Sequence, residues 1–156
     1  MKVIFLDIDG VLNSSSFFNR IFTEEGHCFV NNLLDQNALL NLKDLLWQTG
    51  AYIVISSTWR FDIDTLKKQF APYGITIAGT TQIENIASND FAISRSSEIQ
   101  NFLETRPCFN SYVIIDDLNK MFFSEQQQCH LVSTDPKIGL TKQDVQKAIE
   151  ILNKTE

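Results

Sequence analysis

Short, almost continuous runs of apolar residues recur along the chain, and β-branched residues are frequent in them. The runs lie at residues 3–6, 51–55, 75–78, 112–115 and 131–132. An apolar run of this length, with no polar residue at every second position, is typical of a strand that is buried on both faces. We therefore predict a buried strand over each of these five ranges.

Between these runs, apolar residues recur three or four positions apart, the spacing that places them on one face of a helix. Asp35 is a candidate N-cap, and Gly50 lies just past the end of the helix that it would begin. The apolar face of this helix comprises Ala38, Leu39, Leu42, Leu45 and Leu46. A second helix is predicted to begin at Asp62 or Asp64 and to end before Pro72.

Two further helices are predicted in the second half of the chain. One begins at Ser94, Ser96 or Ser97 and runs to Pro107, with Ile99, Phe102 and Leu103 on its apolar face. The other follows Thr141, which forms a capping-box pattern with Asp144 three residues later. Its apolar face comprises Val145, Ala148, Ile149 and Leu152.

The alternation of strands and helices predicts an α/β fold with a parallel sheet and right-handed crossovers. No repeat, low-complexity tract or linker rich in Pro, Gly or Ser divides the chain, so we expect a single domain over residues 1–156. In such a sheet, ligands bind beyond the carboxyl ends of the strands. The residues that follow each predicted strand are therefore the first candidates for function.

The composition indicates a globular protein and narrows the choice of partners. Hydrophobic residues make up 44% of the chain and charged residues 21%, and there are 12 Phe, 2 Trp and 3 Tyr. A disordered chain lacks this aromatic content. The formal net charge of −6 provides no long-range attraction for nucleic acid, which requires Lys and Arg to neutralise phosphates, although a local basic patch remains open.

The sequence favours a cytoplasmic protein with no membrane partner. Its apolar runs are far shorter than the ~20 residues needed to span a bilayer. The first residues, with Lys2 followed by four apolar residues and then Asp7, are too short for a signal peptide. Cys28, Cys108 and Cys129 are odd in number and widely spaced, which fits a reducing compartment. The sequence gives no indication of the oligomeric state.

Polar side chains with one kind of chemistry follow three of the predicted strands. Asp7 and Asp9 follow the first strand, and Gly10 allows a sharp turn directly after them. The second strand leads into three hydroxyl side chains, Ser56, Ser57 and Thr58, and the fourth leads into Asp116 and Asp117. Clustered carboxylates with hydroxyl donors suit a hard cation such as Mg²⁺, which often also binds a substrate phosphate. The pattern therefore indicates phosphoryl transfer.

These residues carry a resemblance to a known family. The segment Asp7–Leu12 resembles the first motif of the haloacid dehalogenase (HAD) superfamily of phosphohydrolases. Ser57, Arg95 and the Asp116-Asp117 pair resemble its second, third and fourth motifs, in the same order. Over almost the whole chain, the pattern also resembles the HAD domain of Swiss Army Knife RNA repair proteins. It comprises Ser57-Thr58-Trp59-Arg60, Arg95 with Glu98-Ile99, Asp116-Asp117, Asp135-Pro136 and Gly139-Leu140-Thr141.

The resemblance implies a three-layer α/β/α, Rossmann-like fold with little or no cap, a Mg²⁺ cofactor, and a role for each matched residue. Asp7 would be the nucleophile that becomes an aspartyl-phosphate and also a metal ligand. Asp9 would be the general acid/base, with its backbone carbonyl on the metal. Ser57 would bind the transferring phosphoryl group, and Arg95 would offset its charge. Asp116 and Asp117 would complete the metal shell.

Three of these assignments have alternatives. Ser56 could stand in place of Ser57, which we prefer because its spacing to Trp59 matches the family better. Asp117 is favoured over Asp116 for direct contact with the metal. Arg95 stands where the superfamily more often has a lysine. Lys137 is the fallback for this cationic role, but it follows the fourth motif and so breaks the order.

Other residues with possible chemistry have simpler explanations. The pairs His27-Cys28 and Cys129-His130 lack the ligand spacing of a zinc site. Four phenylalanines after the first motif are interpreted as a hydrophobic cover or core rather than a base-stacking platform: Phe17, Phe18, Phe22 and Phe29. Four cations are interpreted as scattered surface charges rather than a polyanion site: Arg20, Arg60, Lys67 and Lys68.

The connections between motifs bear on the substrate. Superfamily members gain specificity from cap domains inserted after the first motif or between the second and third. Here residues 13–34 could form a hairpin or short helix, and residues 61–94 are largely used by a helix and a strand. Neither holds a full cap, and we expect residues 80–93 to form a mobile flap. An open site resembles that of members that act on large substrates, although the net charge does not favour RNA.

Three functions follow as hypotheses. The first is a Mg²⁺-dependent phosphatase that hydrolyses a phosphomonoester, either a small molecule or a nucleic-acid end, through an aspartyl-phosphate. The second is a nucleic-acid 3′-phosphatase or nucleotidase. The third is a non-catalytic binding or effector protein built on the same fold, since fold alone does not establish activity.

Overall fold

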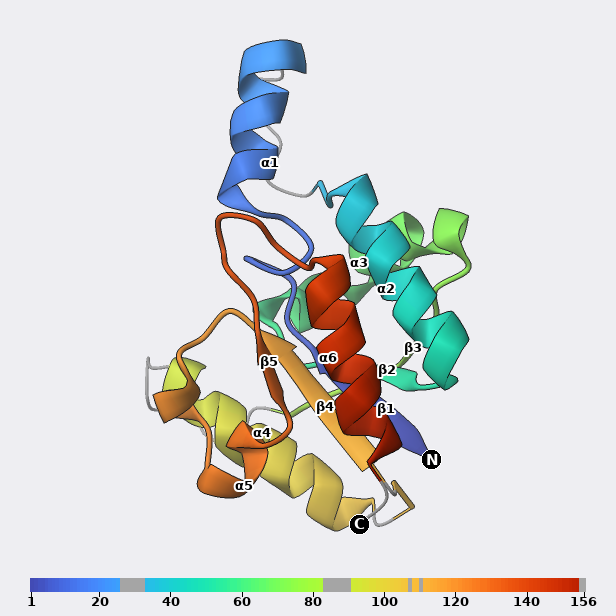
Figure 1. Ribbon diagram of the computed structural model, residues 1–156, viewed down its shortest axis with the longest axis vertical. Coiled ribbons are helices and arrows are strands. Elements are labelled where there is room, and N and C mark those ends of the chain that lie inside the picture. The colour runs from blue at the N-terminus through green and yellow to red at the C-terminus, as the bar shows by residue number, and fades with distance from the viewer. Residues whose placement is uncertain (26–32, 83–90, 107, 110, 155–156) are drawn as a thin grey trace.

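A parallel sheet forms the centre of the protein. The computed structural model describes residues 1–25, 33–82, 91–106, 108–109 and 111–154. The strands are β1 (Lys2–Leu6), β2 (Tyr52–Ile55), β3 (Ile77–Thr80), β4 (Ser111–Asp116) and β5 (Leu131–Ser133). All pair in parallel in the order β3-β2-β1-β4-β5, so β1 lies in the middle (Figure 1).

Helices connect the strands. The α-helices are α1 (Ser15–Arg20), α2 (Gln36–Thr49), α3 (Ile63–Phe70), α4 (Phe91–Thr105), α5 (Glu125–Gln128) and α6 (Lys142–Asn153). Shorter turns are η1 (Ile21–Glu25), which is π-helical, and the 3₁₀ segments η2 (Thr58–Asp62), η3 (Ala71–Tyr73) and η4 (Lys120–Phe122). Within the described residues, none of the helices has the length and apolar character needed to cross a membrane.

The core has two layers because successive residues of a strand point to opposite faces of the sheet. Ile4 and Leu6 of β1 face the cluster that packs against α2, α3 and α6. Val3 and Phe5 face a smaller cluster that packs against Ile99 and Phe102 of α4. Helices therefore cover both faces of a parallel sheet, which confirms the predicted three-layer α/β/α class (Figure 1).

The helix-capping predictions are confirmed at two helices. The Asp35 side chain accepts a hydrogen bond from the Asn37 backbone N–H at 2.9 Å, ahead of α2, and Gly50 ends this helix. Thr141 and Asp144 form a reciprocal capping box at the start of α6. Capping satisfies backbone N–H groups that have no partner within the helix, which is why these side chains mark helix starts in the sequence.

One predicted strand is displaced by two residues. The apolar run at 75–78 predicts a strand there, but β3 covers Ile77–Thr80. Ile75 is buried in the core, yet its backbone N–H donates to the Phe70 carbonyl at 3.3 Å, because the chain is still leaving the turn that ends at Gly74. Hydrophobicity reports burial and does not distinguish a strand from a buried turn.

The predicted start of the third helix is wrong. The serines at 94, 96 and 97 predict an N-cap, but α4 already begins at Phe91. Instead of capping, the Ser96 hydroxyl donates to the Gln127 side chain at 2.5 Å, on a segment distant in sequence. Arg95 therefore lies within the helix and not ahead of it.

The two connections at which superfamily members insert a cap have different structures here. After the first motif, α1 and η1 project from the body of the molecule at one end (Figure 1). Of the expected flap at 80–93, Thr80 ends β3, residues 83–90 lie outside the described residues, and residues 91–93 are helical. The flap prediction is therefore wrong for these helical residues, for Thr80 and for the buried Thr81, and stays a prediction for residues 82–90.

Candidate active site

The middle of the sheet brings two acidic segments together. The chain passes from β1 outward to β2 and β3, and then crosses to the other side of β1 to form β4. In parallel sheets, a crevice opens beyond the carboxyl ends of the strands where the strand order reverses in this way. Asp7 follows β1 and Asp116 ends β4, and the Asp7 backbone N–H donates to the Ile115 carbonyl at 3.0 Å.

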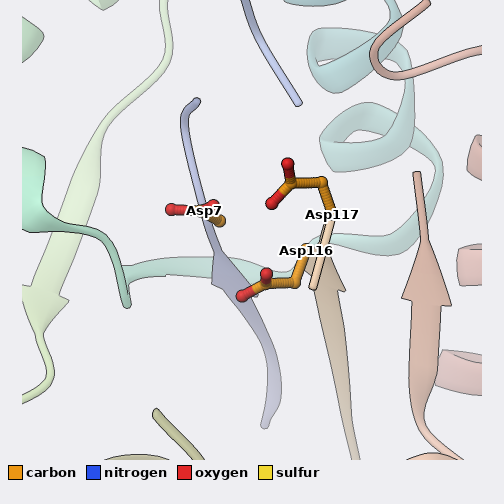
Figure 2. A group of neighbouring side chains, drawn as sticks. All are labelled: Asp7, Asp116 and Asp117. Atoms are coloured by element: carbon orange, nitrogen blue, oxygen red, sulfur yellow. The ribbon is translucent and has the colours of Figure 1, made fainter. Parts of the chain in front are cut away.

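Three carboxylates gather at this crevice. One oxygen from each of Asp7, Asp116 and Asp117 lies within 4.8 Å of the other two. Figure 2 shows the side chains of Asp116 and Asp117, from the end of β4, pointing towards Asp7 at the end of β1. The sequence prediction that these carboxylates share one location agrees with the geometry.

Arg95 is the cation that faces the cluster. Its Nη1 lies 3.4 Å from Asp7 Oδ1 and also bonds Asp116 Oδ2. The residue is only 7% exposed, and its Nε has no hydrogen-bond partner among the described residues. Arg95 is thus buried beside the cluster, whereas the fallback Lys137 is exposed.

Burial sets the electrostatics of the site. Removal from water raises the pKa of Asp7, although Arg95 and a hydrogen bond from Ser57 act in the opposite direction. Burial likewise raises the pKa of Asp116 to about 7 and, with the neighbouring Asp7 charge, raises that of Asp117. For Arg95, burial disfavours the cation, but the charges of Asp7 and Asp116 outweigh it and raise its pKa. One guanidinium thus leaves the three carboxylates short of positive charge.

Asp116 and Asp117 differ in their contacts. Both oxygens of the fully buried Asp116 accept hydrogen bonds, one from Arg95 and one from the Leu118 backbone N–H at 3.0 Å. Asp117 is only partly buried and lines the pocket above Asp7. This difference favours Asp117 over Asp116 for direct contact with a ligand in the pocket.

Gly10 makes room for Asp117. Its φ of 74° lies in the left-handed region, which non-glycine residues avoid, and a Cβ there would lie 2.7 Å from Asp117 Cγ. Thr134, after β5, donates to the Gly10 carbonyl at 3.2 Å and holds the turn in place. The glycine of the first motif is therefore required by both the turn and its acidic neighbour.

Ser57 rather than Ser56 contacts the nucleophile candidate. The Ser57 side chain forms a hydrogen bond with Asp7, and its oxygen also accepts from the Trp59 backbone N–H at 3.4 Å, so that it caps η2. Ser56 is fully buried, and its hydroxyl has no partner among the described residues. The Ser57 side chain thus caps η2 and contacts Asp7 at the same time.

Asp9 lies apart from the carboxylate cluster. It is exposed, and its two oxygens accept from two side chains: Asn13 Nδ2 at 2.7 Å and Trp59 Nε1 at 3.0 Å. Asp9 and Asp7 nevertheless line the same pocket. The sequence singled out Trp59 only as part of a motif, and it gave no signal for the contact of either donor with Asp9.

The pocket at this edge holds about 400 Å³ and is open to solvent. Besides the site residues, Phe18 of α1 and Pro136 line it. The four phenylalanines after the first motif therefore separate: Phe17 belongs to the buried core, Phe18 faces the site, and Phe22 is half exposed. Phe29 lies outside the described residues, as do His27 and Cys28.

Arg60 corrects the expectation of scattered surface cations. Its side chain is 8% exposed and forms an ion pair of 2.6 Å with the buried Glu98 of α4. Two further hydrogen-bond partners of Arg60, Ser57 and Thr81, are buried too. The other three cations, Arg20, Lys67 and Lys68, are exposed as predicted.

The residues of this site fit a divalent cation. The site offers three carboxylates with raised pKa values, two of them buried, and among the described residues one arginine offsets their charge. Carboxylate oxygens are the ligands that Mg²⁺ prefers. An added cation would relieve the remaining repulsion. The described residues thus contain a donor set suited to the predicted cofactor.

Substituting Gly10 by alanine tests the packing of the cluster. The Cβ would displace Asp117, and the left-handed backbone costs a non-glycine residue about 1–2 kcal/mol. We expect Gly10→Ala to lower the free energy of unfolding in urea by at least about 1 kcal/mol and to weaken stabilisation by Mg²⁺. Gly79→Ala is the matched control, because its Cβ would meet nothing within 4 Å. Equal effects of both substitutions would contradict this account.

The raised pKa values predict how stability depends on pH without metal. In the unfolded chain Asp116 ionises near 3.8, whereas in the folded protein it ionises near 7, so the folded state binds more protons between these values. The free energy of unfolding is therefore expected to fall as pH rises across this window. Mg²⁺ binds the ionised carboxylates, so it should raise the melting temperature at pH 8 and have little effect at pH 4.

Differential scanning fluorimetry with Mg²⁺ or EDTA measures both trends. Asp117→Asn should lose most of the Mg²⁺ effect at pH 8, whereas Asp44→Asn, on the exposed face of α2, should retain it. An undiminished Mg²⁺ effect in Asp117→Asn would exclude this cluster as the metal site.

Comparison with known proteins identifies the family. The family model described as the HAD domain in Swiss Army Knife RNA repair proteins matches residues 3–145. Searches of curated proteins and of solved structures find no significant match. The match spans every motif residue named above, from Asp7 to Thr141, and confirms the resemblance drawn from the sequence. The chain therefore belongs to the family of HAD domains found in Swiss Army Knife RNA repair proteins.

Proposed function

We propose that this protein is a Mg²⁺-dependent phosphatase that hydrolyses a phosphomonoester through an aspartyl-phosphate on Asp7. Family membership supports a hydrolase of the HAD type. The observation that carries the finer proposal is the position of Asp7: its carboxylate contacts Arg95, lies within 4.8 Å of oxygens of Asp116 and Asp117, and lines an open pocket.

Asp7 and Asp117 would hold the metal, with Asp116 beside them, and Asp9 would add its backbone carbonyl as the family resemblance implies. When bound, Mg²⁺ supplies positive charge that neutralises the carboxylates and the phosphoryl oxygens. The contacts of Asp116 with Arg95 and Leu118 leave Asp117 as the better candidate for direct coordination.

The residues of the chain can carry both halves of the reaction. A carboxylate oxygen of Asp7 attacks phosphorus, and the bond from phosphorus to the leaving oxygen breaks. Ser57, which contacts Asp7, and Arg95, which lines the pocket, would supply hydrogen-bond donors for the phosphoryl oxygens. A water molecule then attacks the phosphorus of the aspartyl-phosphate, which releases inorganic phosphate and restores the Asp7 carboxylate.

Asp9 is suited to move the proton in both steps. In the first step it would donate a proton to the leaving oxygen, and in the second it would accept one from water. Asp9 is exposed and lines the same pocket as Asp7, so its carboxylate is accessible to both the leaving oxygen and the attacking water. Trp59 and Asn13 hold its carboxylate by hydrogen bonds and so limit its side-chain freedom.

Removing the nucleophile tests the mechanism. Asp7→Asn keeps the size of the side chain but removes the attacking carboxylate, and we expect hydrolysis of an aryl phosphate to fall at least about 1,000-fold. EDTA should abolish activity in the wild type, and Mg²⁺ should restore it. Asp44→Asn is the surface control. Full activity in Asp7→Asn, or turnover that needs no metal, would refute the proposal.

A second candidate is a 3′-phosphatase acting on nucleic-acid ends, or a nucleotidase. The description of the family, which refers to RNA repair proteins, favours it. The open pocket also has room for a phosphate presented at the end of a larger molecule, and Phe18 at its lining offers a ring on which a base could stack. The net charge of −6 acts against this candidate.

A substrate panel separates the two candidates. If nucleic-acid ends are the substrate, kcat/KM for a 3′-phosphorylated oligoribonucleotide should exceed that for sugar phosphates by about 10-fold or more, because stacking adds about 1–3 kcal/mol per base. Phe18→Ala should then lower kcat/KM for the oligonucleotide and leave that for an aryl phosphate nearly unchanged. Equal efficiency on oligonucleotides and sugar phosphates would count against the nucleic-acid candidate.

A further inference from the structure

A second buried ion pair lies beside the site and takes no part in the mechanism above. Arg60 Nη1 lies 2.6 Å from Glu98 Oε2. The same guanidinium nitrogen donates to the Thr81 carbonyl at 2.9 Å and to the Thr81 hydroxyl at 2.8 Å. The Thr81 hydroxyl in turn donates to Glu98 Oε2 at 2.9 Å. These contacts form one closed network.

The network joins three elements, two of which contribute residues to the pocket of the site: Thr58 of η2 and Arg95 of α4. Arg60 lies in η2, which follows β2, Thr81 follows β3, and Glu98 lies in α4. All three side chains are almost completely removed from solvent, with exposed fractions of 8% for the Arg60 side chain and 1% for that of Glu98. Water therefore contributes little screening between these charges.

Stability alone is a poor explanation for such a pair. Burying two charges costs several kcal/mol per ion, and apolar residues of similar size in their place are often neutral or stabilising. What a saturated ion pair does provide is a fixed geometry, because the planar guanidinium bonds its partners in defined directions. Arg60 bonds three residues at once, so it determines how they lie relative to one another.

One of the two proposed phosphate-binding residues, Ser57, is hydrogen-bonded to this network, and the other, Arg95, lies on the same helix as Glu98. Arg60 Nε donates to the backbone carbonyl of Ser57 at 2.9 Å. Glu98 lies one helical turn after Arg95 on α4, and its charge acts on the Arg95 guanidinium. Ser57 and Arg95 come from separate elements, and each of them contacts Asp7.

We propose that Arg60 and Glu98 are positioning residues, which hold Ser57 and Arg95 at the separation that phosphoryl transfer on Asp7 requires. This inference rests on the proposed phosphatase function. It predicts an effect on the chemical step more than on binding, since displacement of a reacting group by about 1 Å costs up to about 100-fold in rate.

The test compares three variants with the wild type in Mg²⁺-dependent hydrolysis of an aryl phosphate. Glu98→Gln keeps the shape and an acceptor oxygen but removes the charge. Arg60→Met removes the network donor. The double variant Arg60→Met/Glu98→Met replaces the whole ion pair by apolar side chains and so leaves no buried charge unpaired. Arg106→Met is the matched control, because Arg106 is exposed at the far end of α4.

We expect kcat to fall about 10- to 100-fold in all three variants, with KM within about 3-fold of the wild type. The double variant distinguishes a positioning role from a purely stabilising role of the ion pair. A melting temperature close to that of the wild type together with a low kcat would support positioning. A kcat restored to within 2-fold of the wild type would overturn the inference. If the double variant does not fold, Glu98→Gln replaces it in the test. A kcat of Glu98→Gln within 2-fold of the wild type would then overturn the proposal.

The proposed function and the positioning role can fail separately. If the wild type hydrolysed no phosphomonoester, the function would be rejected, and a crystal structure of Glu98→Gln would then decide the positioning role. The distance between Arg95 Nη1 and Asp7 Oδ1, now 3.4 Å, should change by about 1 Å or more in that variant. An unchanged distance would overturn the proposal. An active wild type with unaffected variants would refute only the positioning role.

Discussion

Repulsion among carboxylates held away from water is the constraint on which the site depends. Burial raises the pKa of Asp7, Asp116 and Asp117. Only one cation, Arg95, contacts the cluster among the described residues. A fold does not retain three such groups for stability, because each charged form costs free energy in a site of low polarity. The arrangement becomes favourable when further positive charge enters, which is why it suits a divalent cation and a phosphoryl group together.

The surrounding structure keeps this unfavourable cluster in place. Gly10 turns the chain away from Asp7 and leaves space for Asp117, and Thr134 fastens that turn. The sheet brings β1 and β4 side by side at the point where the strand order reverses. The buried ion pair of Arg60 and Glu98 connects η2 to α4. Rigid supports of this kind fix the geometry of a site that its own charges would otherwise drive apart.

The displacement of β3 and the early start of α4 share one physical cause. The apolar run at 75–78 and the serines before Arg95 are real signals of burial and of hydrogen bonding, but each has more than one structural outcome. Ile75 is buried in a turn, not a strand, and Ser96 bonds Gln127 instead of capping a helix. Asp35 and Thr141 were predictable because a helix N-cap is satisfied within a few residues of sequence.

By itself, the sequence determined the α/β class, the central parallel strands and the residues that meet at one edge of the sheet. It could do so because hydrophobic periodicity and helix capping depend on residues that are close in sequence. In addition, the carboxyl ends of parallel strands lie at the same edge of the sheet. Only the tertiary structure decided which partner each side chain has: that Arg95 lies between Asp7 and Asp116, that Trp59 bonds Asp9, and that Arg60 is buried against Glu98. These pairs lie between 21 and 88 residues apart along the chain, and local sequence patterns carry no information about contacts over such separations.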